Sequence, residues 1–113
     1  MRIKGIILHH SVCSSINGKG YDFLITKEGM IIPANEETDP NFIHICLEGD
    51  FGRRQRPFTS EQKEQLFLLH KLTVRMSDLL GLAGDQLYPH NLSCPGAYFP
   101  WSELVISPKD GYH

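Results

Sequence analysis

The sequence predicts an α/β fold, a single domain in which a central mixed β-sheet packs with one long helix and short additional helices. Strand-like apolar runs occupy the first half of the chain, and one amphipathic helical pattern occupies the second half. A length of 113 residues is that of one domain, because chains divide into separate cores only at about twice this length. Apolar residues make up 41%, which is close to the average for globular domains.

Four segments have the short apolar or alternating pattern that is typical of strands: residues 3–8, 21–26, 30–32 and 42–47. The first segment runs directly into His9 and His10. A turn that contains Gly29 joins the second and third segments into a hairpin, which Pro33 ends. The fourth segment ends at Glu48, so all the clear strand signals precede the helix.

The clearest helix spans residue 60 to about residue 80. Thr59 can cap its N-terminus, and Gln62, three residues later, completes a capping box. Gly81 is a natural stop for its C-terminus. Apolar residues recur at intervals of three and four, so one face is expected to be buried. These residues are Leu66, Leu69, Leu72 or Thr73, Met76, and Leu79 or Leu80.

Two short segments follow the helix. Residues 87–88 are an apolar piece that leads to His90, and residues 101–105 have the pattern of a short closing helix. The chain contains neither an internal repeat nor a low-complexity tract, which agrees with a single folding unit.

Charge and hydropathy argue against two classes of partner. The net charge is −2 with both signs interspersed, and no basic stripe is present, so we expect no nucleic-acid partner. No apolar run approaches the ~20 residues of a membrane helix, so we expect no membrane insertion. The first residues lack the pattern of a secretory signal, and a complete chain is therefore expected to be made in the cytoplasm.

Two clusters hold the residues from which a metal site could be built. His9 and His10 end the first strand, where alternation lets only one of them reach a given site. His90 and Cys94 lie four residues apart in a loop. Imidazole nitrogen and thiolate sulfur bind zinc, and a catalytic zinc site has three protein ligands and an open position. From the residues alone, a hydrogen-bonded structural histidine is the more common outcome at a strand end.

Several segments also match a known family in their order along the chain. They are Ile7-Leu8-His9-His10-Ser11, Tyr21-Asp22-Phe23-Leu24-Ile25, Glu28-Gly29-Met30-Ile31, residues 43–51, Phe58-Thr59-Ser60-Glu61-Gln62, Cys94-Pro95-Gly96 and Phe99-Pro100-Trp101. With these segments the chain resembles the zinc-dependent N-acetylmuramoyl-L-alanine amidases, a family that includes phage lysozyme-type amidases and animal peptidoglycan recognition proteins. The resemblance covers nearly the whole chain, and its strength is in the order of the segments.

The resemblance implies that His9, His90 and Cys94 bind one zinc ion (Zn2+) per chain and that Tyr21 is catalytic. The family hydrolyses the amide bond between N-acetylmuramic acid and L-alanine in bacterial peptidoglycan. Zinc lowers the pKa of a bound water to about 7, and zinc and the tyrosine hydroxyl stabilise the oxyanion. His10 and Glu48 are weaker candidates for the substrate groove, since a structural role and a salt bridge are the commoner outcomes for them.

Three features depart from the family pattern. Only three residues separate His90 from Cys94, where the family usually has seven, and Gln86 occupies the position that the usual spacing would give the second histidine. Leu92 stands where many members have a lysine or threonine that helps the oxyanion. Residues 12–20 replace a helix that commonly forms one wall of the groove.

Among the other histidines, His44 lies inside a predicted strand and His70 inside the predicted helix, so neither competes well with His90 as a ligand. Cys13 and Cys46 could pair outside the cell, although packing as small apolar groups is favoured.

Two alternatives to the amidase interpretation stay open. One is a non-catalytic peptidoglycan-binding module of the same fold, and the other is a metal-free domain in which the His and Cys cluster is coincidental. As an enzyme, the chain would be one amidase domain over residues 1–113, without a separate wall-binding domain. This organisation resembles a monomeric phage or prophage endolysin that acts on the cell wall after release or export, and the alternative is a bacterial wall-remodelling enzyme that is exported by other means.

Overall fold

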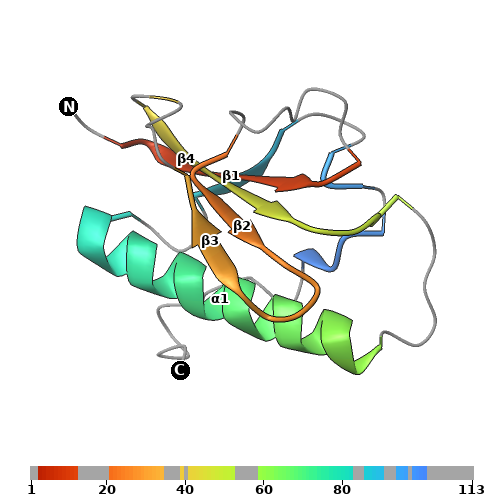
Figure 1. Ribbon diagram of the computed structural model, residues 1–113. Helices are drawn as coiled ribbons and strands as arrows, with labels where there is room; N and C mark the ends of the chain where they lie inside the picture. The colour runs from red at the N-terminus through yellow and green to blue at the C-terminus, as the bar shows by residue number, and fades with distance from the viewer. Residues whose placement is uncertain are drawn as a thin grey trace.

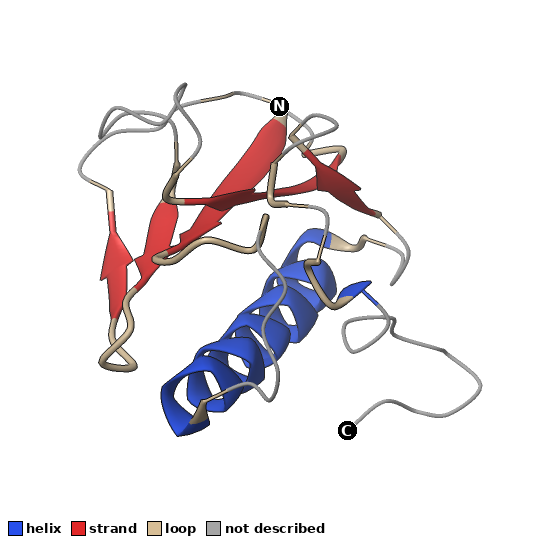
Figure 2. Ribbon diagram, turned by 90° about the vertical axis from the view of Figure 1, so that its right-hand side faces the viewer, coloured by secondary structure: helices blue, strands red, loops and turns tan. Residues whose placement is uncertain are grey.

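The computed structural model of the chain describes residues 3–12, 21–34, 39, 41–52, 59–82, 86–90, 94–96 and 98–101. In this part of the chain, five strands form one mixed sheet, and one long helix covers a face of it (Figures 1 and 2). The elements are β1 (Gly5–His10), β2 (Phe23–Ile25), β3 (Ile31–Pro33), β4 (Phe42–Leu47), α1 (Ser60–Leu80) and β5 (Leu87–Pro89). The predicted α/β class, with its mixed sheet and one long helix, is confirmed.

The strand order in the sheet is β3-β2-β4-β1-β5. β1 is parallel to β4 on one side and to β5 on the other, and β2 is parallel to β4. β3 is antiparallel to β2 and forms an edge of the sheet. The carboxyl ends of four parallel strands therefore meet at one edge, which is where open α/β sheets commonly bind ligands.

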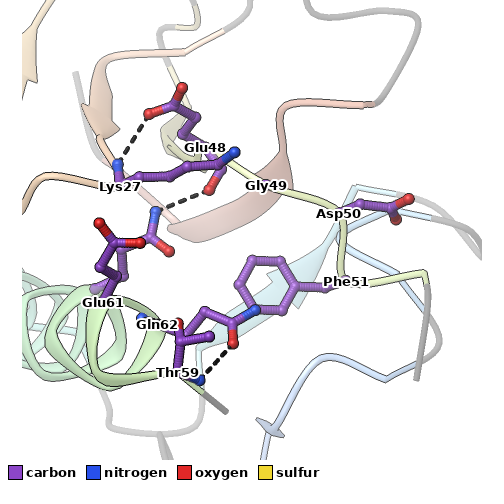
Figure 3. Close-up of a pocket in the computed structure, with 9 residues that line it drawn as sticks. Lys27, Glu48, Gly49, Asp50, Phe51, Thr59, Glu61 and Gln62 are labelled. Carbon is purple, nitrogen blue, oxygen red and sulfur yellow. Dashed lines mark hydrogen bonds between the residues drawn. The ribbon is translucent and has the colours of Figure 1, made fainter. Parts of the chain in front are cut away.

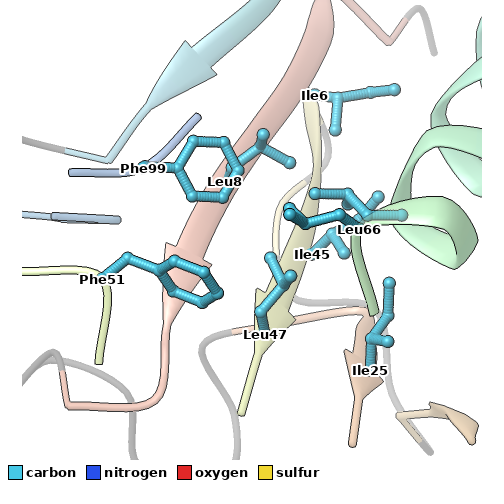
Figure 4. Close-up of a cluster of buried hydrophobic side chains, with 9 residues drawn as sticks. Ile6, Leu8, Ile25, Ile45, Leu47, Phe51, Leu66 and Phe99 are labelled. Carbon is cyan, nitrogen blue, oxygen red and sulfur yellow. The ribbon is translucent and has the colours of Figure 1, made fainter. Parts of the chain in front are cut away.

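The two faces of the sheet differ in what they pack against. The face toward α1 buries the hydrophobic core (Figure 4), made of Ile6, Leu8, Ile25, Ile45, Leu47, Phe51, Leu66, Leu69 and Phe99. Successive side chains of a strand point to opposite faces. His9, next to Leu8 in β1, and His44, next to Ile45 in β4, therefore point away from the helix.

The ends of α1 lie where the sequence predicts them. The Thr59 hydroxyl accepts a hydrogen bond from the Gln62 N–H at 3.1 Å, and the Gln62 side chain accepts one from the Thr59 N–H at 2.8 Å. This reciprocal pair is the capping box, which satisfies two donors that the helix itself leaves unpaired. Gly81 ends the helix in the left-handed conformation at φ 69°. Among the described residues, no helix has both the length and the hydropathy needed to span a membrane.

The buried face of α1 differs from the predicted one near its end. The expectation that Leu79 or Leu80 is buried is wrong, since they are 69% and 37% exposed. The residues of α1 that are buried are Gln65, Leu66, Leu69, Thr73 and Ser77. Polar groups on this face bond to backbone carbonyls, as when Gln65 Nε2 donates to the C=O of Ile25 and of Glu48 at 3.1 and 2.8 Å.

The limits of the strands also differ from the prediction. β1 includes both histidines because β4 continues alongside it as far as the pair His10 and Leu47. The segment predicted only as an apolar piece, residues 87–88, is part of strand β5. β3 begins one residue later than predicted because Met30 belongs to the turn, where its N–H donates to Thr26 Oγ1 at 3.1 Å. Of the expected closing helix, only Trp101 falls within the described residues.

Candidate metal centre

Three metal-ligating side chains from distant parts of the chain meet near the carboxyl edge of the sheet. His9 lies in β1, His90 follows β5, and Cys94 comes four residues later. One nitrogen of each histidine and the cysteine sulfur all lie within 4.8 Å of one another. The structure thus brings together the three residues that the sequence predicts as ligands, and this group could hold a metal ion.

Parallel pairing of β1 and β5 brings the two histidines together. Ile6 pairs with Leu87, and Leu8 pairs with Pro89. The residues that follow Leu8 and Pro89 are His9 and His90, which therefore lie side by side. Their ring centroids are 4.6 Å apart. The register of β5 against β1 therefore places His90 beside His9.

The turn that carries Cys94 is held against the segment that follows β4. Gly96 has φ 110°, a backbone conformation that favours glycine, and a Cβ built on it would lie 2.2 Å from the carbonyl carbon of Phe51. The Tyr98 N–H donates to the Phe51 C=O at 2.9 Å. A residue with a side chain at position 96 would push the turn, and Cys94 with it, away from the sheet.

Burial and neighbouring imidazoles set the charge of His9. His9 is only 2% exposed, and Cys94 is 1% exposed. Burial, and then the nearby His44, His90 and His10, lower the pKa of His9 from 6.5 to about 3. His9 is therefore neutral at physiological pH, which is the form of histidine that binds metals.

The donor set and spacing fit a zinc ion. Two nitrogens and one thiolate are zinc ligands, and three protein ligands leave a fourth position open, as catalytic sites require. Tetrahedral zinc with ordinary bond lengths separates a nitrogen from a sulfur ligand by about 3.6 Å. The distance from His9 Nδ1 to Cys94 Sγ is 3.8 Å. These two atoms are thus already spaced for a common metal.

His44 is the part of the site that the sequence does not predict. Its Nδ1 lies 2.8 Å from His9 Nε2, and its Nε2 lies 2.9 Å from Asp39 Oδ2. The rings of His9 and His44 are stacked with centroids 5.0 Å apart. Strand alternation could have placed His44 on the face opposite Ile43 and Ile45, but the register of β4 against β1 is not visible in the sequence.

Tyr21, the predicted catalytic residue, is half-buried and lies two residues before β2. The adjacent Asp22 binds β4, since its N–H donates to the His44 C=O at 2.6 Å and its carboxylate accepts from the His44 N–H at 2.8 Å. These bonds hold the backbone next to Tyr21 against β4, which lies between β2 and β1 in the sheet. The catalytic role of Tyr21 stays a prediction.

The two weaker candidates lie elsewhere. His10 is 3% exposed, and its Nδ1 accepts a hydrogen bond from the Phe51 N–H at 3.0 Å. Glu48 accepts a hydrogen bond from the Lys27 N–H at 2.8 Å. It lines a cavity of about 240 Å³ beside the N-terminus of α1 (Figure 3), and none of the three candidate metal ligands lines this cavity. Their roles in a substrate groove stay predictions, and the contacts of His10 are those of a structural residue.

The residues behind the departures from the family pattern are only partly described. Gln86 precedes β5, where its Nε2 donates to the Lys4 C=O at 3.2 Å and its C=O accepts from the Ile6 N–H at 3.0 Å. It supports strand pairing, and the ligand position is left to His90. Cys46 is fully buried in β4. Leu92 and Cys13 lie outside the described residues, and so does any bond between Cys13 and Cys46.

Comparisons with known proteins agree with this architecture. The sequence matches no family model and no curated protein. Among solved structures, it is similar to the N-acetylmuramoyl-L-alanine amidase LysC from Clostridium intestinale URNW, with a TM-score of 0.69 and 22% identity over 92% of this chain and 83% of that one. The endolysine N-acetylmuramoyl-L-alanine amidase LysCS from the same organism matches with the same TM-score and identity, covering 92% of this chain and 82% of that one.

A third similar structure comes from another organism. PGRP-Hd from Alvinella pompejana matches with a TM-score of 0.60 and 16% identity, over 87% of this chain and 78% of that one. At these identities the likeness establishes the fold, while the chemistry depends on the residues of this chain. The chain has the fold shared by N-acetylmuramoyl-L-alanine amidases and peptidoglycan recognition proteins, and it carries a His-His-Cys group that could hold a metal as in the zinc amidases.

Proposed function

We propose that this protein is a zinc-dependent N-acetylmuramoyl-L-alanine amidase, which hydrolyses the amide bond between N-acetylmuramic acid and L-alanine in bacterial peptidoglycan. The observation that carries the proposal is the convergence of His9, His90 and Cys94 in this fold. A fold alone does not determine an activity, but a donor set suited to catalytic zinc at the carboxyl edge of the sheet points to hydrolysis.

The residues of the chain divide the proposed chemistry among them. His9 and His90 would hold the metal through imidazole nitrogens, and Cys94 would hold it through its sulfur. Zinc bound there provides a Lewis acid that polarises the amide carbonyl and activates water. The hydroxyl of Tyr21 donates a hydrogen bond to the carbonyl oxygen as negative charge develops on it, and one such donor is worth about 10²–10³ in turnover.

Partner and place of action belong to the same proposal. Bacterial peptidoglycan is the proposed substrate, and residues 1–113 are proposed to form one amidase domain. We further propose an endolysin-like role as a monomer, in which the protein is made in the cytoplasm and acts on the wall after release or export. The names of the two clostridial structures, an amidase and an endolysine, support this role.

Mass spectrometry of digested peptidoglycan tests the activity. Purified walls treated with the zinc-loaded protein should release free stem peptides that begin with L-alanine. A chelator should abolish the release, and added zinc should restore it. Intact muropeptides from zinc-loaded protein contradict the amidase proposal, and if the protein still binds the walls they favour the non-catalytic binding module.

A matched pair of cysteine variants makes this test specific. Cys94→Ser removes the thiolate ligand, and we expect the loss of both bound zinc and peptide release. Cys46→Ser makes the same change at a buried cysteine outside the metal group, and we expect both to be retained. Metal analysis of the two purified variants provides the first readout, and peptide release provides the second. Equal zinc content in both variants excludes Cys94 as a ligand.

A further inference from the structure

We propose that His44, held by Asp39, fixes the ring of His9 in the tautomer whose free lone pair is on Nδ1, the nitrogen that faces Cys94. This inference deepens the proposed function and relies on it for the identity of the metal. It concerns the positioning of a ligand, and it gives roles to two residues, His44 and Asp39, outside the metal group.

The two ring nitrogens of His9 face different partners. Nδ1 lies 3.8 Å from Cys94 Sγ. Nε2 lies 2.8 Å from His44 Nδ1, which is a hydrogen-bond distance between two imidazole nitrogens. One of these two nitrogens must therefore carry the hydrogen, and its location decides which nitrogen of His9 is free for a metal.

Asp39 determines the direction of the hydrogen bonds. The hydrogen bond from His44, and then that from the Asn41 N–H, lower the pKa of Asp39, so its carboxyl group is ionised and can only accept. Its Oδ2 lies 2.9 Å from His44 Nε2, which must therefore carry a hydrogen. In a neutral His44 ring, Nδ1 is then the acceptor. His9 Nε2 becomes the donor, and the lone pair of His9 is left on Nδ1.

The strand and a local turn hold this chain of hydrogen bonds in place. The backbone of His44 is bonded to Asp22 in both directions, at 2.6 and 2.8 Å. Asp39 Oδ1 accepts a hydrogen bond from the Asn41 N–H at 2.8 Å, which orients its carboxylate. The stacked ring of His44 lies at 28° to that of His9. The acceptor for His9 Nε2 is therefore positioned before any metal binds.

The arrangement is a longer version of a common one. Histidines that bind metals usually donate their other N–H to a carboxylate or a carbonyl, and loss of that partner typically costs 10–100-fold in affinity or activity. Here the imidazole of His44 stands between the carboxylate of Asp39 and the ligand His9. The carboxylate of Asp39 therefore affects His9 through the hydrogen bonds of the His44 ring.

The first test measures the tautomer in metal-free protein. Long-range proton–nitrogen NMR correlations at neutral pH identify which nitrogen of each labelled histidine carries its hydrogen. We expect the hydrogen of His9 on Nε2 in the wild type and a mixture of tautomers in His44→Phe. A hydrogen on Nδ1 of His9 in the wild type overturns the proposal, and so does an unchanged tautomer in His44→Phe.

The second test measures zinc affinity by competition with a chelator. His44→Phe keeps a ring but removes the acceptor, and we expect zinc to bind about 10–100-fold more weakly. His44→Asn places an amide oxygen near the position of Nδ1, and we expect it to recover most of the affinity. If His44 acts only by packing, the order is reversed, with Phe better than Asn, and that order overturns the proposal.

Asp39 is tested with a matched control. Asp39→Asn removes the charge of the carboxylate that accepts the hydrogen bond from His44, and we expect weaker zinc binding than in the wild type. Asp78→Asn makes the same change at an exposed position of α1 and should leave zinc affinity unchanged. Equal affinities in the two variants overturn the role of Asp39.

Spectra of cobalt-substituted protein distinguish positioning from direct ligation. If His44 positions His9, His44→Phe should bind cobalt more weakly but show absorption of the same intensity at saturation. A change in intensity that indicates a lost ligand overturns the proposal, because it makes His44 a ligand itself.

The two proposals fail separately. If the protein binds zinc and the variants follow the expected order but no stem peptides appear, the amidase proposal falls and the positioning role stands. If the wild type does not bind zinc, the amidase proposal again falls, and the tautomer of His9 in the metal-free protein decides the positioning role alone.

Discussion

At the residue scale, the surroundings of His9 keep its imidazole in the neutral form that a metal ligand requires. His9 lies in β1, its ring packs against the rings of His44 and His90, and it is almost fully buried. A protonated ring in that place would be both desolvated and repelled. Burial and the neighbouring histidines thus keep the ring neutral, and the proposed hydrogen bond to His44 keeps its hydrogen on Nε2.

The lowered pKa of His9 predicts acid sensitivity in the metal-free protein. Unfolding returns the pKa from about 3 to 6.5, so below pH 6.5 the unfolded chain binds a proton that the folded chain does not. The contribution of His9 to the free energy of unfolding is therefore fully present above pH 6.5, and it is lost as the pH falls toward 3. Urea unfolding at several pH values in this range measures the slope. We expect a shallower slope in His9→Asn, and equal slopes in the two proteins contradict the prediction.

The candidate ligands could be predicted from the sequence, whereas their partners could not. His9, His90 and Cys94 are the ligands that the family resemblance implies, and the structure brings them together. His44 looked like an ordinary strand residue, because a strand shows its alternation locally but not its register against another strand. Once Ile7 is paired with His44, the imidazole next to His9 becomes visible.

At the element scale, local signals explain which parts of the fold were predictable. The capping box and the terminal glycine of α1 act within a few residues, and both helix ends agree with the prediction. β5 has only three residues, and its strand character depends on pairing with β1, about 80 residues earlier in the chain. The buried face of α1 includes Gln65 and Ser77, because tertiary packing selects residues that apolar spacing alone does not.

The turn after Cys94 gives a prediction at this scale. Gly96→Ala combines an unfavourable positive φ with a clash against the backbone of Phe51, so we expect lower stability and weaker zinc binding. Gly81→Ala is the matched control, since it has φ 69° but nothing within 4 Å of the added Cβ. The left-handed conformation alone should cost the control about 1–2 kcal/mol. Urea unfolding and chelator competition measure both variants, and normal zinc affinity in Gly96→Ala contradicts the prediction.

At the scale of the whole molecule, the sheet separates the hydrophobic core from the side chains of His9 and His44. The face toward α1 contains the hydrophobic cluster, whereas His9 and His44 point to the other face. β1 lies between two parallel neighbours, so residues distant in sequence reach one edge of the sheet. The same architecture is shared with structures that are only 22% identical, which is expected when side chains at the site can change without disturbing the core.

This separation predicts that zinc stabilises the whole domain through the proposed ligands alone. His9 and Cys94 are 85 residues apart in sequence and meet only in the folded chain, so the unfolded chain offers no formed site. At a free zinc concentration 100 times the Kd, folding should gain about 2.7 kcal/mol, measured as a shift of the urea midpoint. Cys94→Ser should lose this shift and Cys46→Ser should keep it. Magnesium should not replace zinc, because it prefers oxygen ligands. An equal shift in Cys94→Ser, or one produced by magnesium, would mean that the ion binds elsewhere, since a metal held by His9, His90 and Cys94 requires the thiolate.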